Sequence, residues 1–453
     1  MRIIHWFRRD LRLSDNNALF QASTASKEVY PVFVFDTNIL SKLEDQDDAR
    51  ISFIFDSLQE IQEKLAKNDA KLCILHGDPV DLIPKLAQEI GADAVYANED
   101  YDPYSKKRDS QVNKQLARFQ IKFELFKDHV IFSGNEVLKK DGTPYRVFTP
   151  YKNEWLRRVN PDVISDFRPK LGSLSSFDTK LKTVHKLSDI NFIRTKRDVL
   201  GGEKQAGKVF NQFLKRIDGY DDNRDFIFQD SNSHLSPYLR FGCISTRYLV
   251  RQSLFLESKG AKVWLSEIIW REFYQMILDQ FPHVINKEFN EKYIGIKWPG
   301  KPEHFKKWKD GQTGYPIIDA AMRCFKETGQ MHNRLRMIVA SFLVKDLLID
   351  WRKGERYFAA KLLDYDLAAN NGGWQWSAST GCDAQPYFRV FNPESQSKRF
   401  DPDGKFIRKW VPELADLTSK AIHAPMNVPG YPDPIVDHST QRLLAIDLFK
   451  SAR

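Results

Sequence analysis

Acidic, amide and aromatic side chains alternate with small residues over LLDYDLAANNGGWQWSAST, residues 362–380. Small residues let a flat ligand approach the backbone closely, and a tryptophan in a protein interior needs a partner for its indole N–H. Asp364 and Asp366 are two positions apart, so they do not face each other on a helix. Such carboxylates are more often buried partners of an arginine, or of a ligand's N–H and O–H groups, than a paired acid and base. The pattern predicts a site for a flat, polar ligand.

Two further runs place polar groups on strongly apolar helices. In WLSEIIWREFY (264–274), Glu267 and Trp270 are three positions apart, on neighbouring rows of a helix, and can approach one site together. In MHNRLRM (331–337), arginines open an apolar helix whose first N–H groups and positive dipole end suit anions. The competing interpretations are a half-buried amphipathic helix for the first run and ordinary solvated arginines for the second.

Motifs for metal binding and nucleophilic catalysis are absent from the sequence. The ten histidines form no HExxH or HxxxH pair, the four cysteines form no CxxC pair, and neither a GxSxG elbow nor a Walker loop occurs. We therefore predict no metal site. Scattered cysteines are typical of a reducing compartment, and there is neither an apolar signal core nor a run of about 18 apolar residues. We expect a cytoplasmic protein that does not enter a membrane.

The charge balance permits a polyanionic partner. Lys and Arg number 69 against 60 Asp and Glu, which gives a formal net charge of +9. No long run of like charge occurs, so a phosphate-binding surface would be assembled by folding and not by a basic tail.

The first third of the chain alternates strand-like and helix-like patterns. Apolar residues follow a helical period at 51–65 and 82–90. This alternation predicts a doubly wound, mostly parallel five-stranded sheet with helices on both faces. No GxGxxG follows the first strand, so a dinucleotide is not expected there. Arg8, Arg9 and Arg12 of that turn could meet a phosphate, but we favour a solvated, structural role for them. Strands are expected at 3–7, 29–35, 71–76, 93–98 and 122–126.

The chain is too long for one core, and its pattern changes twice. Turn signals and apolar residues mix after residue 130, and from residue 199 only helical periodicity remains, including one predicted helix across 333–350. We therefore predict an α/β N-terminal domain at 1–130, a long ordered interdomain linker at 131–198 that wraps the surface, and a nearly all-α C-terminal domain at 199–453.

Several runs are long enough to compare with a known family. WREFY, MHNRLRM, SFLVKDLLIDWRKGERYF and LAANNGGWQWSAST resemble the DNA photolyase and cryptochrome family, most closely the class I cyclobutane pyrimidine dimer photolyases. The likeness covers essentially the whole chain. It implies an α/β antenna-chromophore domain and a helical domain that binds FAD and the DNA lesion. It also implies light-driven repair of pyrimidine dimers in UV-damaged DNA, by electron transfer from excited reduced FAD to a flipped-out dimer.

The resemblance assigns residues to the FAD. Arg336 and Asp364 would form a buried ion pair near the flavin, and Asn370 would face flavin N5. Asn232 and His234 depart from the family pattern, because many relatives have Thr and Arg or Lys there. The implied FAD-binding residues are Tyr220, Asn232, Ser233, His234, Leu235, Ser236, Trp264, Arg271, Arg336, Asp364, Asp366 and Asn370.

The two tryptophans of GGWQW receive different tasks from the resemblance. Trp374 would be the proximal member of an electron-transfer chain from the flavin to the surface. Trp351 would be the middle member and Trp298 the outer one. Trp376 would instead face the lesion, opposite Trp270.

Lesion recognition follows from the same likeness. Glu267 would hydrogen-bond the dimer and stabilise its reduced form. The implied catalytic residues are Glu267, Asn370, Trp298, Trp351 and Trp374. Aromatic walls would replace the stacking that the dimer has lost, while arginines supply affinity that falls with salt. The implied DNA-binding residues are Arg224, Glu267, Trp270, Asn333, Arg334, Met337, Trp376 and Arg389.

Other members of the family are less similar in their key residues. Plant-type cryptochromes carry Asp and animal types Cys at the Asn370 position, so Asn370 favours a repair enzyme. Photolyases for the (6-4) lesion need a histidine pair where only His332 is present. The alternative is a blue-light sensor without repair activity, and a flavin electron carrier that ignores DNA is a third class. No obligate protein partner is implied, and we expect a monomer.

The antenna chromophore is left open. Tyr104 and Ser105 stand where folate-binding relatives use an Asn–Glu pair. ARISF around Arg50 and DPYSKKRD, which begins at Asp102, are more similar to the branch that binds 8-hydroxy-5-deazaflavin. Deazaflavin is therefore favoured, with Arg50, Asp102 and Tyr104 as its residues; folate, a flavin or an empty pocket are the alternatives.

Overall fold

The computed structural model describes residues 1–452 and divides into two compact units. Unit 1 comprises residues 1–144, 152–217 and 233–279, and unit 2 comprises 145–151, 218–232 and 280–453. This division follows compactness. The predicted boundaries at 130 and 198 follow the change in pattern along the chain, and they stay a prediction.

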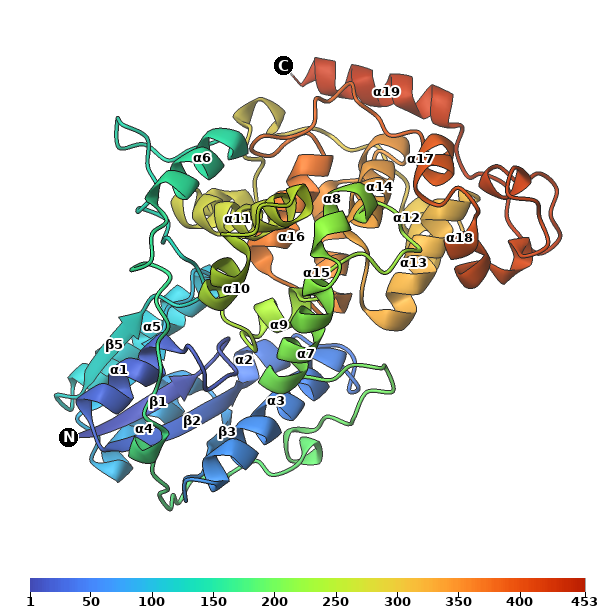
Figure 1. Cartoon of the computed structure of the whole chain (residues 1–453). Coiled ribbons are helices and arrows are strands. Elements are labelled where there is room, and N and C mark those ends of the chain that lie inside the picture. Colours follow the sequence, from blue (N-terminus) through green and yellow to red (C-terminus); the bar gives the residue numbers. More distant parts are fainter. Residues whose placement is uncertain (453) are drawn as a thin grey trace. The chain divides into compact units, whose positions relative to one another are not determined.

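Unit 1 contains a five-stranded sheet in which all neighbouring strands are parallel. The strand order is β3-β2-β1-β4-β5 (Figure 1). The predicted sheet is confirmed, and the predicted strands are correct apart from a residue or two at their ends. The strands are β1 (Arg2–Phe7), β2 (Glu28–Asp36), β3 (Cys73–Gly77), β4 (Ala94–Asn98) and β5 (Lys122–Phe126).

Successive strand residues point to opposite faces of the sheet. Apolar side chains on a face are buried by the helices that pack on it. Ile4 and Trp6 of β1 belong to one buried cluster with residues of α4 (Pro79–Ile90) and α5 (Pro103–Ala117). The connection from β1 to β2 contains α1 (Asn17–Ala25), and that from β2 to β3 contains α2 (Thr37–Leu40) and α3 (Ala49–Ala66). The N-caps of α2 to α5 are all aspartates whose side chains accept a backbone N–H. The caps are Asp36, Asp48, Asp78 and Asp102.

Most of the predicted linker packs on unit 1. The N–H of Ser175 donates to the carbonyl of Val29 at 2.8 Å, and the N–H of Val184 donates to that of Ile74 at 2.8 Å, so the segment is fixed to two strands. It contains two 3₁₀ turns, at Leu171–Ser173 and Leu187–Ile190. The helix α6 (Phe148–Arg158) lies in a region for which no helix was predicted.

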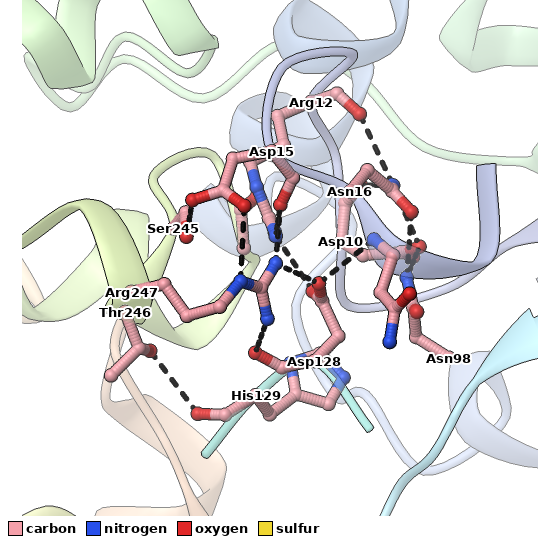
Figure 2. A network of polar contacts seen from close by, with 12 residues as sticks. Asp10, Arg12, Asp15, Asn16, Asn98, Asp128, His129, Ser245, Thr246 and Arg247 are labelled. Atoms are coloured by element: carbon pink, nitrogen blue, oxygen red, sulfur yellow. Dashed lines mark hydrogen bonds and ion pairs between the residues drawn. The ribbon is translucent and has the colours of Figure 1, made fainter. Parts of the chain in front are cut away.

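The helices of unit 1 that follow the linker are α7 (Glu203–Leu214), α9 (Ser236–Arg240), α10 (Thr246–Ser253) and α11 (Lys259–Gln280). A buried polar network joins the turn after β1 to α10 (Figure 2). Asp128 accepts from Nη2 of Arg12 and from Nη2 of Arg247, each at 2.7 Å. Nε of Arg247 also donates to Asp15 at 3.0 Å. The network fixes α10 to the carboxyl edge of the sheet.

The solvated role predicted for the arginines after β1 is wrong. Arg12 is 2% exposed and forms part of the network around Asp128. Arg8 pairs with Asp109 at 2.5 Å, and Arg9 pairs with Asp100 at 3.1 Å. All three are structural, but their partners come from distant parts of the chain that folding brings together.

In the part of unit 2 that the structure describes, every regular element is a helix or a helical turn, which confirms the nearly all-α prediction. Its core includes Trp308, Phe358 and Trp374. Shorter 3₁₀ turns connect the helices, and among residues 1–452 no helix combines the length and hydropathy needed to cross a membrane. The helices are α8 (Tyr220–Asn223), α12 (Pro302–Asp310), α13 (Pro316–Thr328), α14 (Asn333–Ser341), α15 (Trp351–Lys361), α16 (Leu367–Ser377), α17 (Pro393–Phe400), α18 (Lys405–Trp410) and α19 (His438–Ser451).

The single helix predicted across 333–350 is wrong. The α-helix ends at Ser341, and Phe342–Asp346 forms a π-helical turn. Lys345 and Asp346 are both buried there. Nζ of Lys345 donates to the carbonyl of Arg389 at 3.0 Å, and Asp346 pairs with Nδ1 of His438 at 2.5 Å. The wider turn coincides with two adjacent buried charges that contact different parts of unit 2.

Candidate functional site

A charged pair in unit 2 links α14 to the turn before α16. Nη2 of Arg336 donates to both carboxylate oxygens of Asp364, at 3.0 and 2.8 Å, and its Nε donates to the carbonyl of Met331 at 2.9 Å. The Asp364 side chain is 6% exposed and that of Arg336 is 30% exposed. The predicted ion pair is therefore present, and part of the Arg336 side chain remains exposed.

The first turn of α16 is fixed by two polar side chains. Asp366 caps the helix and accepts from the N–H groups of Ala368 at 3.1 Å and Ala369 at 3.3 Å. Asn370 is buried, and its Nδ2 donates to the carbonyl oxygen of Glu355 at 3.1 Å and to its Oε1 at 2.9 Å. Asp364 and Asp366 thus have separate tasks, as their spacing predicts. Glu355, the partner that orients the Asn370 amide, was not identified from the sequence.

Replacing Asn370 by Asp is expected to make the stability of the protein depend on pH. Burial raises the pKa of Glu355, and the hydrogen bond from Asn370 opposes that rise. A second carboxylate would remove the donor and raise the pKa of the pair, so the folded protein would take up a proton that the unfolded chain does not hold at neutral pH. We expect the free energy of unfolding of the variant to be about 1–3 kcal/mol lower than that of the wild type near pH 8. This difference becomes smaller as the pH falls.

Urea unfolding of Asn370→Asp and of the wild type, at pH 8 and at successively lower pH, measures the effect. Asn333→Asp is the matched control, because Asn333 is an exposed asparagine on α14. A variant whose stability parallels that of the wild type at every pH would contradict the placement of Asn370 against Glu355.

The tryptophans of α16 have different surroundings. Trp374 is buried and makes edge contacts with Phe358, at 5.0 Å between ring centroids, and with Trp308, at 6.2 Å. Trp376 is half-buried. Two positions on a helix differ by about 200° in direction, so the two rings point different ways. This agrees with their assignment to different tasks, which stays a prediction.

Glycine is needed beside Trp374, but at a position that the sequence did not indicate. A Cβ on Gly354 of α15 would lie 2.1 Å from the Trp374 ring, so only glycine allows this contact. A Cβ on Gly373 would meet no atom within 4 Å among the described residues. A side chain at position 373 would therefore meet open space, so packing does not require glycine there.

Unit 1 positions the α11 residues through a buried carboxylate. Glu272 is fully buried and accepts from the N–H groups of Ile131 and Phe132 at 2.6 and 3.0 Å, and from Nε1 of Trp155 at 2.6 Å. Burial raises the pKa of Glu272 to about 7, although these donors act against the rise. Glu272 lies inside WREFY but was not identified from the sequence; it fixes the helix that carries Glu267.

The α11 side chains assigned to the FAD and to the lesion differ in accessibility. Trp264 is 2% exposed and stacks on Phe210, which leaves little of its surface for a flavin. Trp270 is half-buried and packs against Tyr274, with 5.5 Å between the ring centroids. Glu267 is also half-buried, and so is Arg271, whose Nη1 donates to the carbonyl of His129 at 2.8 Å.

The loop assigned to the FAD phosphates has residues in both units. In unit 2, Tyr220 is buried and Nδ2 of Asn232 lies 2.8 Å from Nε2 of His332. In unit 1, His234 has a φ of 53°, Leu235 is buried, and Ser236 opens α9. Ser233 is half-buried, whereas His234 and Ser236 are exposed.

The residues of unit 2 assigned to DNA differ in how firmly they are held. Arg334 pairs with Asp225 at 2.6 Å and lies over the Phe400 ring, so folding already uses part of its charge. Arg389 is exposed, and buried Lys345 holds its carbonyl. Arg224 is half-buried. On α14, Asn333 is exposed and Met337 is half-buried.

The antenna residues lie near the carboxyl ends of the strands in unit 1. Arg50 donates twice to Asp48, from Nε at 2.9 Å and from Nη2 at 2.5 Å. The Tyr104 hydroxyl donates to Asp36, the last residue of β2, at 2.5 Å. Asp102 caps α5. Ligands of doubly wound sheets bind at this edge, but each of these side chains already has a partner within unit 1.

Among residues 1–452, no group of three His, Cys, Asp or Glu side chains is placed to hold a metal ion. The polar and aromatic groups around α14 to α16 are instead a partly exposed arginine side chain, buried carboxylates, a buried amide and aromatic rings. These groups fit an aromatic ligand with several N–H and C=O groups. FAD has this chemistry.

Comparison with family models identifies a known family for both halves of the chain. Residues 264–451 match the family model described as the FAD binding domain of DNA photolyase, and residues 3–169 match the model described as DNA photolyase. A parallel sheet followed by a helical FAD-binding region defines a two-part class of flavoprotein. The chain belongs to the DNA photolyase family.

Curated relatives align with nearly the whole chain. The deoxyribodipyrimidine photo-lyase of Vibrio cholerae is 40% identical, with 100% of both chains covered. That of Synechococcus sp. is 40% identical, covering 97% of this chain and 94% of the relative, and that of Escherichia coli is 38% identical, covering 99% and 98%.

Solved structures of the same family share the fold. A class III photolyase from Agrobacterium tumefaciens has a TM-score of 0.89 at 34% identity, covering 100% of this chain and 97% of that one. An archaeal photolyase from Sulfolobus tokodaii, solved with two FAD molecules, has a TM-score of 0.88 at 36% identity and covers 100% of both chains. A cryptochrome from Synechocystis has a TM-score of 0.88 at 26% identity, covering 99% of both chains.

Proposed function

We propose that this protein is a deoxyribodipyrimidine photo-lyase, which uses light to split cyclobutane pyrimidine dimers in DNA. The observation that carries the proposal is the full-length alignment with relatives of that name, together with an Arg336–Asp364 pair and a buried Asn370 in the region that matches the FAD-binding family. When bound, reduced FAD supplies one electron on excitation and recovers it after the bond is split.

The chain's own residues bind and orient the reactants. Arg336 and Asp364 would hold the FAD through the accessible part of their ion pair. The Asn370 amide, oriented by Glu355, would present its oxygen to the ring system. Trp270 and Trp376, both half-buried, would stack on the flipped dimer, and a half-buried carboxylate at Glu267 would accept hydrogen bonds from it.

Trp374, Trp351 and Trp298 form the proposed electron route that reduces the cofactor. Trp374 and Trp351 belong to the same buried cluster, and Trp298 packs against that cluster while remaining partly exposed. A series of indoles from the interior to the surface is suited to carry single electrons inward from an external reductant.

A second chromophore is proposed for the α/β unit. The two FAD molecules in the Sulfolobus tokodaii photolyase show that a relative can hold two aromatic cofactors. We retain 8-hydroxy-5-deazaflavin as the preferred ligand, bound near Arg50, Asp102 and Tyr104, with a flavin as the first alternative. Reconstitution with each chromophore, read by fluorescence energy transfer to FAD, distinguishes them. We also propose a monomer, with access to DNA inside the cell.

The substrate is tested by binding of an oligonucleotide with one thymine dimer, against the same oligonucleotide without damage. We expect tighter binding of the damaged strand and an affinity that falls with salt. Trp270→Ala should weaken binding of the damaged strand by about 1–3 kcal/mol. Phe255→Ala, which removes an aromatic ring that is 75% exposed, is the control and should have no effect. Equal affinity for the two oligonucleotides would contradict the proposal and favour the blue-light sensor.

A further inference from the structure

The indole N–H of Trp351 faces a buried carboxylate. Trp351 is fully buried, and its Nε1 donates to Oε1 of Glu288 at 3.4 Å. Glu288, which precedes the 3₁₀ turn at Glu291–Tyr293, is 1% exposed. A backbone carbonyl would satisfy this N–H without the cost of burying a charge. Trp308 in the same cluster uses the carbonyl of Val339 in this way.

One guanidinium neutralises the carboxylate and also covers the indole. Nη2 of Arg352 lies 2.8 Å from Oε2 of Glu288, and the same guanidinium lies over the Trp351 ring, 4.9 Å from its centroid. Arg352 is also held by Asp350 at 3.1 Å and by the carbonyl of Asn286 at 3.0 Å. Among residues 1–452, Oε2 of Glu288 has this ion pair but no aligned hydrogen bond. Oε1 is the oxygen that faces the indole N–H.

The positions of the charges matter if Trp351 is oxidised. Loss of an electron puts a positive charge on an indole that already lies under the Arg352 guanidinium, in surroundings of low dielectric constant. Transfer of the Nε1 proton to Glu288 makes both the indole and the carboxyl neutral. The remaining positive charge then resides on Arg352, whose side chain is 23% exposed and can be solvated.

We propose that Glu288 is the proton acceptor of Trp351 during electron transfer, an inference that rests on the proposed electron route. One electron leaves the Trp351 ring for oxidised Trp374, whose own electron has gone to photoexcited oxidised flavin. The Nε1–H bond of Trp351 breaks, and an O–H bond forms on Oε1 of Glu288. An electron supplied from outside through Trp298, by a thiol reductant, and return of the proton restore the starting state. Glu288 thereby slows the back-reaction, because the neutral radical is a weaker oxidant than the protonated one.

Glu288→Gln tests the proposal with little change of shape, because the amide oxygen can still accept the indole N–H but is not basic. After a light flash on protein loaded with oxidised FAD, transient absorption follows conversion of the tryptophan radical cation to the neutral radical. We expect this step to be slower in heavy water for the wild type. In the variant we expect it to be on the order of a hundredfold slower. Glu291→Gln, at an exposed glutamate of the same segment, is the control.

A double variant separates chemistry from folding. Glu288→Gln leaves Arg352 with Asp350 as its remaining carboxylate partner. Glu288→Gln with Arg352→Gln removes both charges of the Glu288–Arg352 pair and should show the same slow deprotonation. Repair by protein with chemically reduced FAD should be unchanged in both variants, because it does not use the tryptophan route. Wild-type deprotonation rates in both variants would overturn the inference. Absence of any tryptophan radical in the wild type would overturn the electron route and this inference together, while the repair assay would still report on the proposed function.

Discussion

Asp128→Ala is expected to lower the free energy of unfolding of unit 1 by about 3–5 kcal/mol. Asp128 is fully buried between Arg12 and Arg247, and its removal leaves two buried guanidiniums without their shared carboxylate (Figure 2). Urea unfolding followed by circular dichroism measures the loss. Asp178→Ala, at an exposed aspartate of the same unit, is the control and should change stability by less than about 0.5 kcal/mol.

The same carboxylate gives the expected effect of pH. Burial alone would raise the pKa of Asp128, but Arg12 and Arg247 outweigh it and hold the pKa well below its usual range. A group whose pKa is lower in the folded protein stabilises it fully above the unfolded value of about 4, and this contribution is lost as the pH falls further. The difference between wild type and Asp128→Ala should therefore shrink below about pH 4. A difference that stays constant to lower pH would contradict the ion-pair account.

Trp374→Phe is expected to slow photoreduction of oxidised FAD by more than about tenfold, or over ~1.4 kcal/mol of barrier. Phenylalanine keeps an aromatic ring against Phe358 and Gly354 but is much harder to oxidise than indole. Repair by protein whose FAD is reduced chemically should persist, because the electron that splits the dimer does not pass through Trp374. Absorbance of the flavin under blue light with a thiol reductant measures the first quantity, and dimer loss measures the second.

Trp308→Phe is the matched control for this variant. Trp308 is as deeply buried as Trp374, touches its ring and belongs to the same cluster. Both substitutions leave a similar cavity, so a change that comes from loosened packing would appear in both. Equal slowing of photoreduction in the two variants would mean that packing, and not oxidation of Trp374, explains the loss.

The sheet could be predicted from the sequence because its signals are local. Each strand reads as a short β-branched or aromatic run followed by turn residues, and the helices between them follow their period closely. The buried network could not be predicted in the same way. Arg12 meets Asp128, 116 positions away, and Arg247 meets Asp15, 232 positions away. The sequence around Arg12 alone is that of an ordinary charged turn.

In the candidate site too, residues with a local sequence signal could be predicted, whereas pairs of residues that are distant in the sequence could not. Asp364 and Asn370 stand out through their polar, small and aromatic neighbours, and the resemblance adds Arg336 as a partner. Glu288 has no such signal, because it is one acid among mixed residues and its indole partner lies 63 positions further on. Glu355 lies within a recognised run, yet only the structure pairs it with Asn370.

Light-dependent repair tests the central claim most directly. Protein with reduced FAD is mixed with an oligothymidine that contains a cyclobutane dimer, under blue light and in darkness, and recovery of the ultraviolet absorbance of thymine is followed. We predict recovery in light only, with a large loss in Glu267→Ala. No recovery in light by protein that is fully loaded with reduced FAD would contradict the repair function and leave the blue-light sensor as the account of this fold.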